Sequence, residues 1–415
     1  MTMNHGLLII GSSQAGVSLA TSLRALGYDE PITMLGDENH RPYQRPALSK
    51  EWLQGEITND SLMFRSADYW DEHRIDVVKN ERIIRIAKNA DGSGVAHSMS
   101  GAEFHFDRLA LAVGARPRRL LIEGVDLPGV LYLRNADDAL ELKARVPDVE
   151  RVVVVGGGFI GLEAAASLHT MGKTVTLVEA APRLVSRAVG EDTSAYLLDH
   201  HRSQGIDIEV GTTVSRILAR GDRVSGVELA DGRTIDADLV LVGVGVIPNT
   251  ELAESIGLEC SDGVRVDATA IASDGVTVAV GDCANLPNPV PGAPEGDRVR
   301  FESVNNAIEQ AKVAAYAIMG RREDYAGIPW FWSNQDAIKL QIAGLSAGHD
   351  RTLVRAEPER GKRSVLYYRG DRIIAADCIN HPLDFMAVRN ALANGAAIPF
   401  DEAADPAVRL KSITV

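Results

Sequence analysis

The stretch Arg151–Glu179 constrains the fold of this chain more than any other part of its sequence. A run of valines leads into a G-x-G-x-x-G sequence, a helical pattern follows, and a second apolar strand ends at Glu179. This order predicts a strand, a tight turn, a helix and a parallel strand, the unit that binds a dinucleotide pyrophosphate at the helix N-terminus. Gly156 would form the turn, Gly158 would admit the phosphates, and Gly161 would let helix and strand pack closely. An ordinary glycine turn in a parallel sheet is the alternative.

Glu179 also predicts which dinucleotide binds. It follows the glycines by about twenty residues, where an acidic residue contacts the ribose in such units. A carboxylate accepts hydrogen bonds from a 2′-hydroxyl and repels a 2′-phosphate, and the next arginine is Arg183. The sequence therefore favours NAD(H) over NADP(H).

A second unit of the same kind opens the chain. Strand Leu7–Ile10 leads into Gly11, a helix begins near Gly16, and the next strand ends before Asp37. Ser13 stands where the middle glycine belongs, but its hydroxyl can donate a hydrogen bond to a phosphate. We therefore expect a second nucleotide site, with a unit that has lost its ligand as the alternative.

The sequences after the two turns repeat as well. Ile75–Val77 is echoed by Ile206–Ile208, and residues 106–117 are echoed by residues 235–248. The chain therefore contains two tandem nucleotide domains.

The apolar strand Val276–Val280 has no glycine turn of its own. Because the second domain is complete without it, we expect this strand to join the first sheet, which makes the second domain an insertion. Asp282 would then face the ligand of the first domain. A plain Gly-Asp turn is the alternative.

The C-terminal part of the chain differs from both domains. Ser303 predicts the start of a helix that ends at Gly320, with an apolar stripe formed by Ile308, Ala311, Ala315 and Ile318. From Tyr325 onward, alternating strands, a hairpin near Gly370 and a helix near Asp384–Asn394 predict a small α+β domain with an antiparallel sheet.

Charge and cysteine placement exclude several function classes. A net charge of −14 and a pI near 5.2 argue against nucleic acid as a partner. The sequence has neither an apolar run of membrane-spanning length nor a secretory signal, so we expect a cytoplasmic protein without membrane contact. A monomer and a homodimer are both open as oligomeric states. Cys260, Cys283 and Cys378 lie far apart, which predicts no disulfide framework, dithiol pair or metal site. Any redox chemistry must then be carried by a bound cofactor.

Five motifs link nearly the whole chain to one family. They are Arg41–Lys50 (RPYQRPALSK), Gly156–Ala165, Val246–Asn249, Gly281–Ala284 (GDCA) and Trp330–Gln335 (WFWSNQ). With these motifs the chain resembles the FAD-dependent NADH:ferredoxin reductases of Rieske-type oxygenase and bacterial cytochrome P450 systems. It departs from the family pattern at Ser13, Val113 and Asn334, none of which removes a group that the chemistry requires.

The resemblance implies an α/β fold with two tandem Rossmann-like, glutathione-reductase-like domains, the second inserted in the first, and a C-terminal α+β domain. Residues 1–115 and 246–325 would form the FAD-binding domain, 116–245 the NAD-binding domain and 326–415 an interface domain. The implied FAD-binding residues are Gly11, Ser13, Gly16, Asp37, Arg41, Arg45, Pro46, Lys50, Arg82, Ala112, Gly114, Asp282 and Val304. The implied NAD-binding residues are Gly156, Gly158, Ile160, Gly161, Glu179 and Gly245.

Three residues are implied to act in the reaction. Lys50 would lie beside the isoalloxazine, where an ammonium can stabilise the charge of a reduced flavin. Glu163 would lie near Lys50 and the nicotinamide, and Trp332 near the flavin edge that faces the ferredoxin. The alternatives are a solvated lysine, an acid that only favours the helix N-terminus, and a core aromatic residue.

The implied activity is electron transfer from NADH through FAD to a [2Fe–2S] ferredoxin. One rival is an NADH oxidase or peroxidase, which would be expected to carry a redox cysteine near the flavin, where this chain has Ser49. The other is a redox sensor of the apoptosis-inducing-factor type. Arginines at 116, 118, 119, 298 and 300 are a candidate docking surface for an acidic ferredoxin.

Overall fold

The computed structural model describes residues 5–290 and 293–415, which fall into two compact units. Unit 1 comprises Met1–Gln44, Asn59–Arg116 and Ile247–Pro329. Unit 2 comprises Arg45–Thr58, Pro117–Val246 and Trp330–Val415. The chain leaves unit 1 for the short segment Arg45–Thr58, again within β8 (Ala115–Pro117) until it returns within β17 (Val246–Pro248), and finally after Pro329.

A parallel five-stranded sheet forms the centre of unit 1, in the order β19-β7-β1-β2-β3. Its strands are β1 (Leu7–Ile10), β2 (Ile32–Leu35), β3 (Ile75–Val78), β7 (Arg108–Leu111) and β19 (Val278–Ala279). β19 pairs with β7 in parallel, with Val278 opposite Ala110. The expectation that the late apolar strand joins the first sheet is therefore confirmed, and with it the insertion of the second domain.

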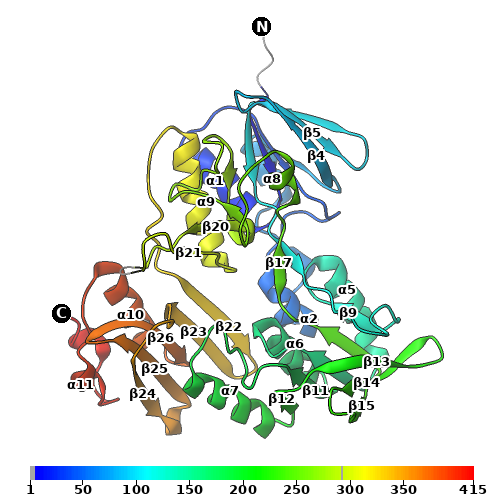
Figure 1. The fold of residues 1–415 in the computed structure, drawn as a ribbon, viewed down its shortest axis with the longest axis vertical. Helices are drawn as coiled ribbons and strands as arrows, with labels where there is room; N and C mark the ends of the chain where they lie inside the picture. The colour runs from blue at the N-terminus through cyan, green and yellow to red at the C-terminus, as the bar shows by residue number, and fades with distance from the viewer. Residues whose placement is uncertain (1–4, 291–292) are drawn as a thin grey trace. The chain divides into compact units, whose positions relative to one another are not determined.

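Two helices pack together on this sheet, α1 (Gln14–Ala25) and α9 (Val304–Ile318) (Figure 1). Ser303 caps α9 as predicted, because its side chain accepts a hydrogen bond from the amide of Asn306 at 3.1 Å. The predicted apolar stripe is wrong at Ile308, which is 41% exposed. The buried face runs through Ala307 instead, one position earlier and about 100° around the helix.

Smaller elements complete unit 1. One antiparallel sheet contains β4 (Ile83–Lys88), β5 (Gly94–Ser98) and β6 (Glu103–Phe106), and a mixed sheet contains β18 (Val264–Arg265), β20 (Ala284–Pro287) and β21 (Arg298–Val299). The short helices are α3 (Asn59–Leu62), α4 (Ala67–Glu72), α8 (Glu251–Ser255) and η3 (Gly281–Cys283).

A second parallel sheet lies in unit 2, in the order β12-β11-β10-β16-β9. Its strands are β9 (Val130–Tyr132), β10 (Arg151–Val155), β11 (Thr174–Glu179), β12 (Asp207–Val210) and β16 (Leu239–Val242). The helices are α5 (Ala136–Arg145), α6 (Phe159–Thr170) and α7 (Glu191–Ser203), with η1 (Arg45–Ser49), α2 (Glu51–Gln54) and η2 (Val146–Asp148). The strands β13 (Val214–Arg220), β14 (Arg223–Leu229) and β15 (Thr234–Asp236) form an antiparallel sheet, in which Asp231 and Gly232 lie in the turn between β14 and β15.

The C-terminal part of unit 2 contains the predicted antiparallel sheet, in the order β22-β23-β26-β25-β24. Its strands are β22 (Trp330–Gln335), β23 (Ile338–Gly344), β24 (Arg351–Glu357), β25 (Lys362–Arg369) and β26 (Arg372–Ile379). Helix α10 (Pro382–Asn394) ends at Gly395, whose φ of 65° is the left-handed conformation that favours glycine there. The remaining short helices are η4 (Pro358–Arg360), α11 (Phe400–Ala403) and η5 (Leu410–Ser412).

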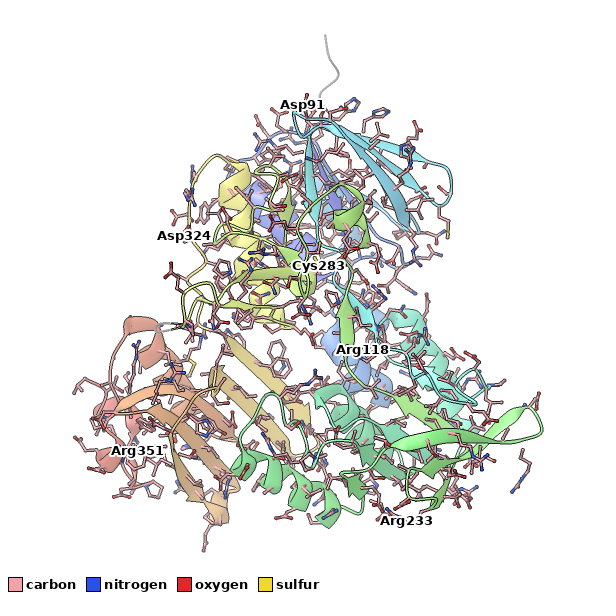
Figure 2. All side chains as sticks on the ribbon, in the orientation of Figure 1. Asp91, Arg118, Arg233, Cys283, Asp324 and Arg351 are labelled. Carbon is pink, nitrogen blue, oxygen red and sulfur yellow. The ribbon has the colours of Figure 1, made fainter. Side chains whose placement is uncertain are left out.

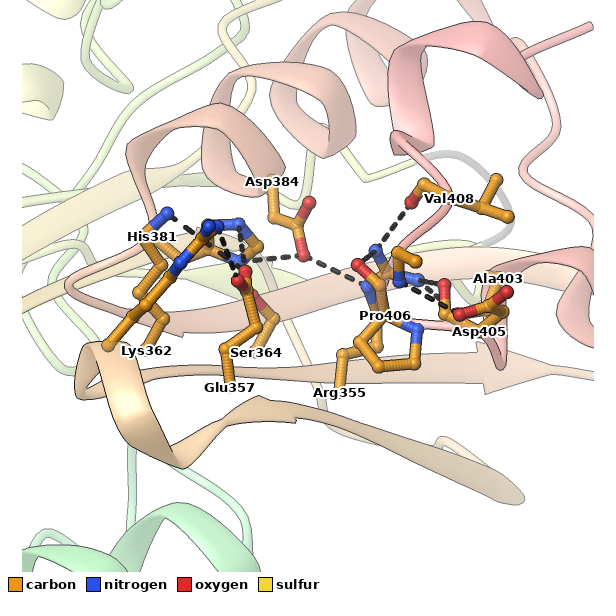
Figure 3. A network of polar contacts seen from close by, with 12 residues as sticks. Arg355, Glu357, Lys362, Ser364, His381, Asp384, Ala403, Asp405, Pro406 and Val408 are labelled. Atoms are coloured by element: carbon orange, nitrogen blue, oxygen red, sulfur yellow. Dashed lines mark hydrogen bonds and ion pairs between the residues drawn. The ribbon is translucent and has the colours of Figure 1, made fainter.

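Arg355 of β24 binds the segment 403–408 to this sheet (Figure 3). Its side chain is 2% exposed and pairs with Asp384 of α10 at 3.0 Å. The same guanidinium donates to the carbonyls of Ala403, of Asp405 at 2.9 Å and of Val408 at 2.7 Å. The buried charge is thus paired and hydrogen-bonded, which is the condition under which such burial is tolerated.

No helix among residues 5–290 and 293–415 is both long and apolar enough to span a membrane.

Candidate active site

The first glycine turn, in unit 1, has a backbone geometry that requires glycine at two positions. Gly11 has a φ of 117°, and a Cβ there would lie 2.1 Å from the carbonyl oxygen of Ala112. A Cβ on Gly16 would lie 1.9 Å from the carbonyl oxygen of Gly11. Neither position therefore admits a larger residue, and the tight turn leaves the N-terminus of α1 at the carboxyl end of the sheet.

Several predicted FAD-binding residues of unit 1 meet at this end of the sheet. Gly281 of η3 packs on the start of α1, since its Cβ would lie 2.8 Å from that of Ala15, and η3 also packs on α9, where Val304 is the first residue. Asp282 is therefore brought to the N-termini of two helices. Helix N-termini favour phosphate and other anionic groups, so the donors present fit a dinucleotide.

The other predicted residues of unit 1 lie at the edges of this region. Asp37 is exposed beyond β2, and Ala112 and Gly114 follow β7. Arg41 is partly exposed and lies 3.9 Å from Asp60, as the guanidinium-to-carboxylate distance. Arg82 is exposed just before β4.

Cys283 is buried in η3 (Figure 2). Its thiol donates to the carbonyl of Val280 at 3.3 Å, and burial raises its pKa to about 11. The thiol therefore stays protonated and unreactive at neutral pH.

The second glycine turn, in unit 2, repeats the backbone geometry of the first. Gly156 has a φ of 114°, and a Cβ there would lie 2.3 Å from the carbonyl oxygen of Gly243. A Cβ on Gly161 would lie 2.0 Å from the carbonyl oxygen of Gly156. At Gly158, by contrast, a Cβ would meet no atom within 4 Å. The protein does not fill this space, so the residues present fit a pyrophosphate that does.

Glu179 is held at the end of β11 by two backbone donors. One carboxylate oxygen accepts from the amide of Gly157 at 2.5 Å, and the other accepts from the amide of Ala181 at 2.7 Å. Ile160, in the first turn of α6, leaves 42% of its surface exposed, and a guanidinium nitrogen of Arg187 lies 3.3 Å from the Cβ position of Gly245. Glu179 is thus fixed next to the glycine turn, Ile160 is exposed in the same turn, and Arg187 lies beside Gly245.

A buried ion pair joins two distant segments of unit 2. Lys50 Nζ lies 3.0 Å from Glu163 Oε2, and both side chains are at most 10% exposed. The hydroxyl of Ser49 donates to the same oxygen at 2.7 Å, and the hydroxyl of Ser333 donates to Glu163 Oε1 at 2.7 Å. The expected proximity of Lys50 and Glu163 is therefore present, and both oxygens of the carboxylate have a donor.

Trp332 and its neighbours form an aromatic cluster on β22. The rings of Trp332 and Trp330 lie 5.5 Å apart, and Phe331 packs against Phe159 of α6 at 4.5 Å. Trp332 is partly exposed. The predicted residues Arg45 and Pro46 begin η1, where the guanidinium of Arg45 donates to the carbonyl of Arg134 at 2.8 Å.

Four buried polar residues make hydrogen bonds at this site that were not predicted from the sequence, namely Ser49, Ser333, Gln335 and His201. The last two continue the contacts of Ser333, since Gln335 Nε2 donates to its hydroxyl at 3.0 Å and His201 Nε2 lies 2.9 Å from Gln335 Oε1. The alternation of aromatic and polar residues along β22 could have indicated the buried polar pair. Residues two apart on a strand share a face, so Ser333 and Gln335 lie opposite to Trp332.

Most of the candidate docking arginines contact their own unit. Arg300 pairs with Asp262 and Glu302, and its side chain is 9% exposed. Arg298 donates to Asn285, Arg116 pairs with Glu251, and Arg119 stacks 4.0 Å from the Tyr132 ring. Arg118 is exposed (Figure 2).

Comparison with known proteins extends over the whole chain. Residues 5–311 match the family model described as pyridine nucleotide-disulphide oxidoreductase, and residues 330–414 match a reductase C-terminal model. Rhodocoxin reductase of Rhodococcus erythropolis is 40% identical over 405 residues, which cover 98% of this chain and 93% of that protein.

Two solved structures are also similar. The ferredoxin reductase for the CYP199A2 system of Rhodopseudomonas palustris superimposes with a TM-score of 0.93 at 39% identity, covering 99% of this chain and 100% of that one. The reductase in a covalent putidaredoxin reductase–putidaredoxin complex gives a TM-score of 0.92 at 35% identity, covering 98% and 97%.

The glycine turns, the fold and the C-terminal domain thus agree with the sequence comparisons along nearly the full length. Members of this family use FAD and a nicotinamide dinucleotide to transfer electrons. The chain belongs to the pyridine nucleotide-disulphide oxidoreductase family, among its ferredoxin reductases.

Proposed function

We propose that this protein is an NADH:ferredoxin oxidoreductase that supplies a [2Fe–2S] ferredoxin of an oxygenase or cytochrome P450 system. Residues 1–115 and 246–325 bind FAD, residues 116–245 bind NADH, and residues 326–415 form the interface domain. FAD bound there would supply the chemistry that links the two-electron donor NADH to a one-electron acceptor. The chain's own residues supply binding, orientation and electrostatics.

The observation that carries this proposal is the buried Lys50–Glu163 pair. An ammonium held by a carboxylate and kept from water stabilises negative charge that develops next to it far better than a solvated lysine does. Lys50 therefore orients and stabilises the flavin ring, and Glu163 keeps Lys50 in place.

The coenzyme preference depends on Glu179. Both of its oxygens accept backbone hydrogen bonds, so the carboxylate cannot rotate away from an incoming ribose. It accepts from the 2′-hydroxyl of NADH and repels the 2′-phosphate of NADPH. Gly156, Gly158 and Gly161 hold the pyrophosphate at the start of α6, and Ile160 and Gly245 line the nucleotide.

The FAD site uses the first turn in the same way. Gly11, Ser13 and Gly16 hold its pyrophosphate, Asp37 its ribose, and Asp282 and Val304 the groups between phosphate and ring. Arg41, Arg45, Pro46, Arg82, Ala112 and Gly114 complete the contacts. Trp332 lies at the flavin edge that the ferredoxin approaches.

The partner and location follow from the relatives and the coenzyme. The solved complex with putidaredoxin supports a small iron–sulfur partner, which we specify as [2Fe–2S]. The protein works in the cytoplasm, where NADH is available, as a monomer or homodimer without nucleic-acid or membrane partners.

Steady-state kinetics test this function. The FAD-loaded protein is mixed with NADH, cytochrome c and purified [2Fe–2S] ferredoxins, and reduction of cytochrome c is followed. We expect ferredoxin to be required, and NADH to give a much higher kcat/KM than NADPH. Oxygen or peroxide consumption that ferredoxin does not change would indicate an oxidase or a redox sensor instead.

A further inference from the structure

A chain of buried hydrogen bonds runs from the Lys50–Glu163 pair to helix α7. Glu163 Oε1 accepts from Ser333 at 2.7 Å, Ser333 accepts from Gln335 at 3.0 Å, and Gln335 Oε1 lies 2.9 Å from His201 Nε2. Each of these residues is at most 5% exposed. Three segments that are far apart in the sequence therefore meet in one buried polar chain.

The carboxylate fixes the direction of every link. An ionised carboxylate only accepts, and a serine hydroxyl has one proton, so Ser333 donates to Glu163 and must accept from its other neighbour. Gln335 then donates through its amide nitrogen and accepts through its oxygen. His201 must consequently carry a proton on Nε2. Burial lowers the pKa of His201, which favours the neutral imidazole in this position.

We propose that Ser333, Gln335 and His201 are positioning residues for hydride transfer, which act on Lys50 through Glu163. This inference rests on the proposed function of Lys50. The donors of the chain point toward Glu163, so the chain holds that carboxylate in one rotamer. A carboxylate fixed in this way holds the Lys50 ammonium at one place, and displacement of such a group by about 1 Å can cost up to a hundredfold in rate.

The rate experiment uses the FAD-loaded protein in single-turnover mixing with NADH. We expect Ser333→Ala, Gln335→Leu and His201→Phe each to slow the loss of flavin absorbance about tenfold, with the NADH dissociation constant changed by less than about twofold. Ser333→Thr, which keeps the hydroxyl, should restore most of the rate. Loss of NADH affinity with an unchanged limiting rate would overturn the proposal.

Tyr367→Phe is the matched control. The Tyr367 hydroxyl donates to Asp377 and accepts from the amide of Gly190, just before α7, so it also ties α7 to the C-terminal sheet. It makes no contact with the chain to Glu163. We expect this variant to lose thermal stability without the change in limiting rate, and an equal slowing would mean that the chain is only structural.

A double-mutant cycle separates this inference from the proposed function. In a Glu163→Gln background, Gln335→Leu should cause no further slowing, because its effect passes through Glu163. Equal slowing in both backgrounds would overturn the inference alone. If Glu163→Gln and Lys50→Met themselves leave the rate unchanged, the proposed role of Lys50 fails instead.

The direction of the chain has a test that needs no turnover. In protein labelled with ¹⁵N-histidine, NMR should show His201 neutral and protonated on Nε2, and Gln335→Leu should shift that signal. Protonation on Nδ1 alone would contradict the chain.

Discussion

The two glycine turns share the geometry of their first and last glycines and differ at the middle residue. Gly11 and Gly156 share a φ near 115°, and in both turns the last glycine would clash with the carbonyl of the first. The middle position differs, since Ser13 replaces the glycine that leaves open space at Gly158. The turn itself is therefore a property of the fold, whereas the middle position is not constrained by the backbone.

The carboxyl ends of β2 in unit 1 and β11 in unit 2 also differ. Glu179 ends β11 with its carboxylate bonded to Gly157, whereas Gly36 follows β2, and a Cβ there would lie 2.2 Å from the hydroxyl oxygen of Ser12. The Ser12 side chain of the unit 1 turn thus occupies the space that a side chain at Gly36 would need. The acidic residue comes one position later, at Asp37.

The largest effects are expected from the shared glycines. Gly11→Ala and Gly156→Ala each combine a strained positive φ with a clash against backbone, which costs about 2–6 kcal/mol of stability. Gly11→Ala should yield protein without FAD. Gly156→Ala should keep FAD, reducible by dithionite but not by NADH. Flavin content and anaerobic reduction measure both.

Gly27→Ala and Gly172→Ala are the matched controls, because they lie after α1 and α6 with positive φ and no atom near the Cβ position. Both should keep flavin and NADH reduction. Flavin loss in Gly156→Ala, or NADH reduction of it, would contradict the assignment of one cofactor to each turn.

Glu179 should have the next largest effect. Glu179→Ala removes an attraction to the 2′-hydroxyl and a repulsion of the 2′-phosphate, each about 1–3 kcal/mol. We expect the ratio of kcat/KM for NADH to that for NADPH to fall at least tenfold. Asp37→Ala, at the matching edge of unit 1, should leave this ratio unchanged, and a change there would undo the contrast between the two strands.

Gly158→Ser gives the second turn the sequence pattern of the first. Because no atom lies within 4 Å of a Cβ there, the free energy of unfolding should change by less than about 0.5 kcal/mol. KM for NADH should nevertheless rise about tenfold, since the side chain enters the phosphate space. Unchanged KM would show that the open space is not used by the coenzyme.

Ser13→Gly makes the reciprocal change and should have the smallest effect. Loss of one hydroxyl donor is worth about 1 kcal/mol, so FAD should remain bound at one per chain with a dissociation constant raised about fivefold. Isothermal titration of apoprotein with FAD measures the change. A loss of FAD altogether would show that Ser13 carries the site.

The sequence predicted the fold well because its signals are local. The β-branched runs, the glycines and the Ser303 cap each lie within a few residues of the structure they produce. The Lys50–Glu163 contact spans 113 residues and became an expectation only through family resemblance. Ser333 and Gln335 were not predicted, because polar side chains next to the aromatic residue Trp332 do not by themselves show that their face of β22 is the buried one.

His201 could not be found in this way. Its position on α7 gives no sign of a partner, because the contact with Gln335 depends on how the C-terminal sheet packs against that helix. Ile308 shows the same limit on a smaller scale, since a helical stripe predicts which residues share a face but not where the neighbouring helix lies.

The pairing of β19 with β7 has a consequence for synthesis on the ribosome. Strands β1, β2, β3 and β7 emerge within the first 111 residues, but β19 begins at Val278 and α9, which packs on α1, ends at Ile318. The first sheet therefore lacks its edge strand β19 and the covering helix α9 while the whole parallel sheet of unit 2 is synthesised. Exposed strand edges of this kind attract other chains, so the nascent N-terminal segment is the part of this protein most in need of a chaperone.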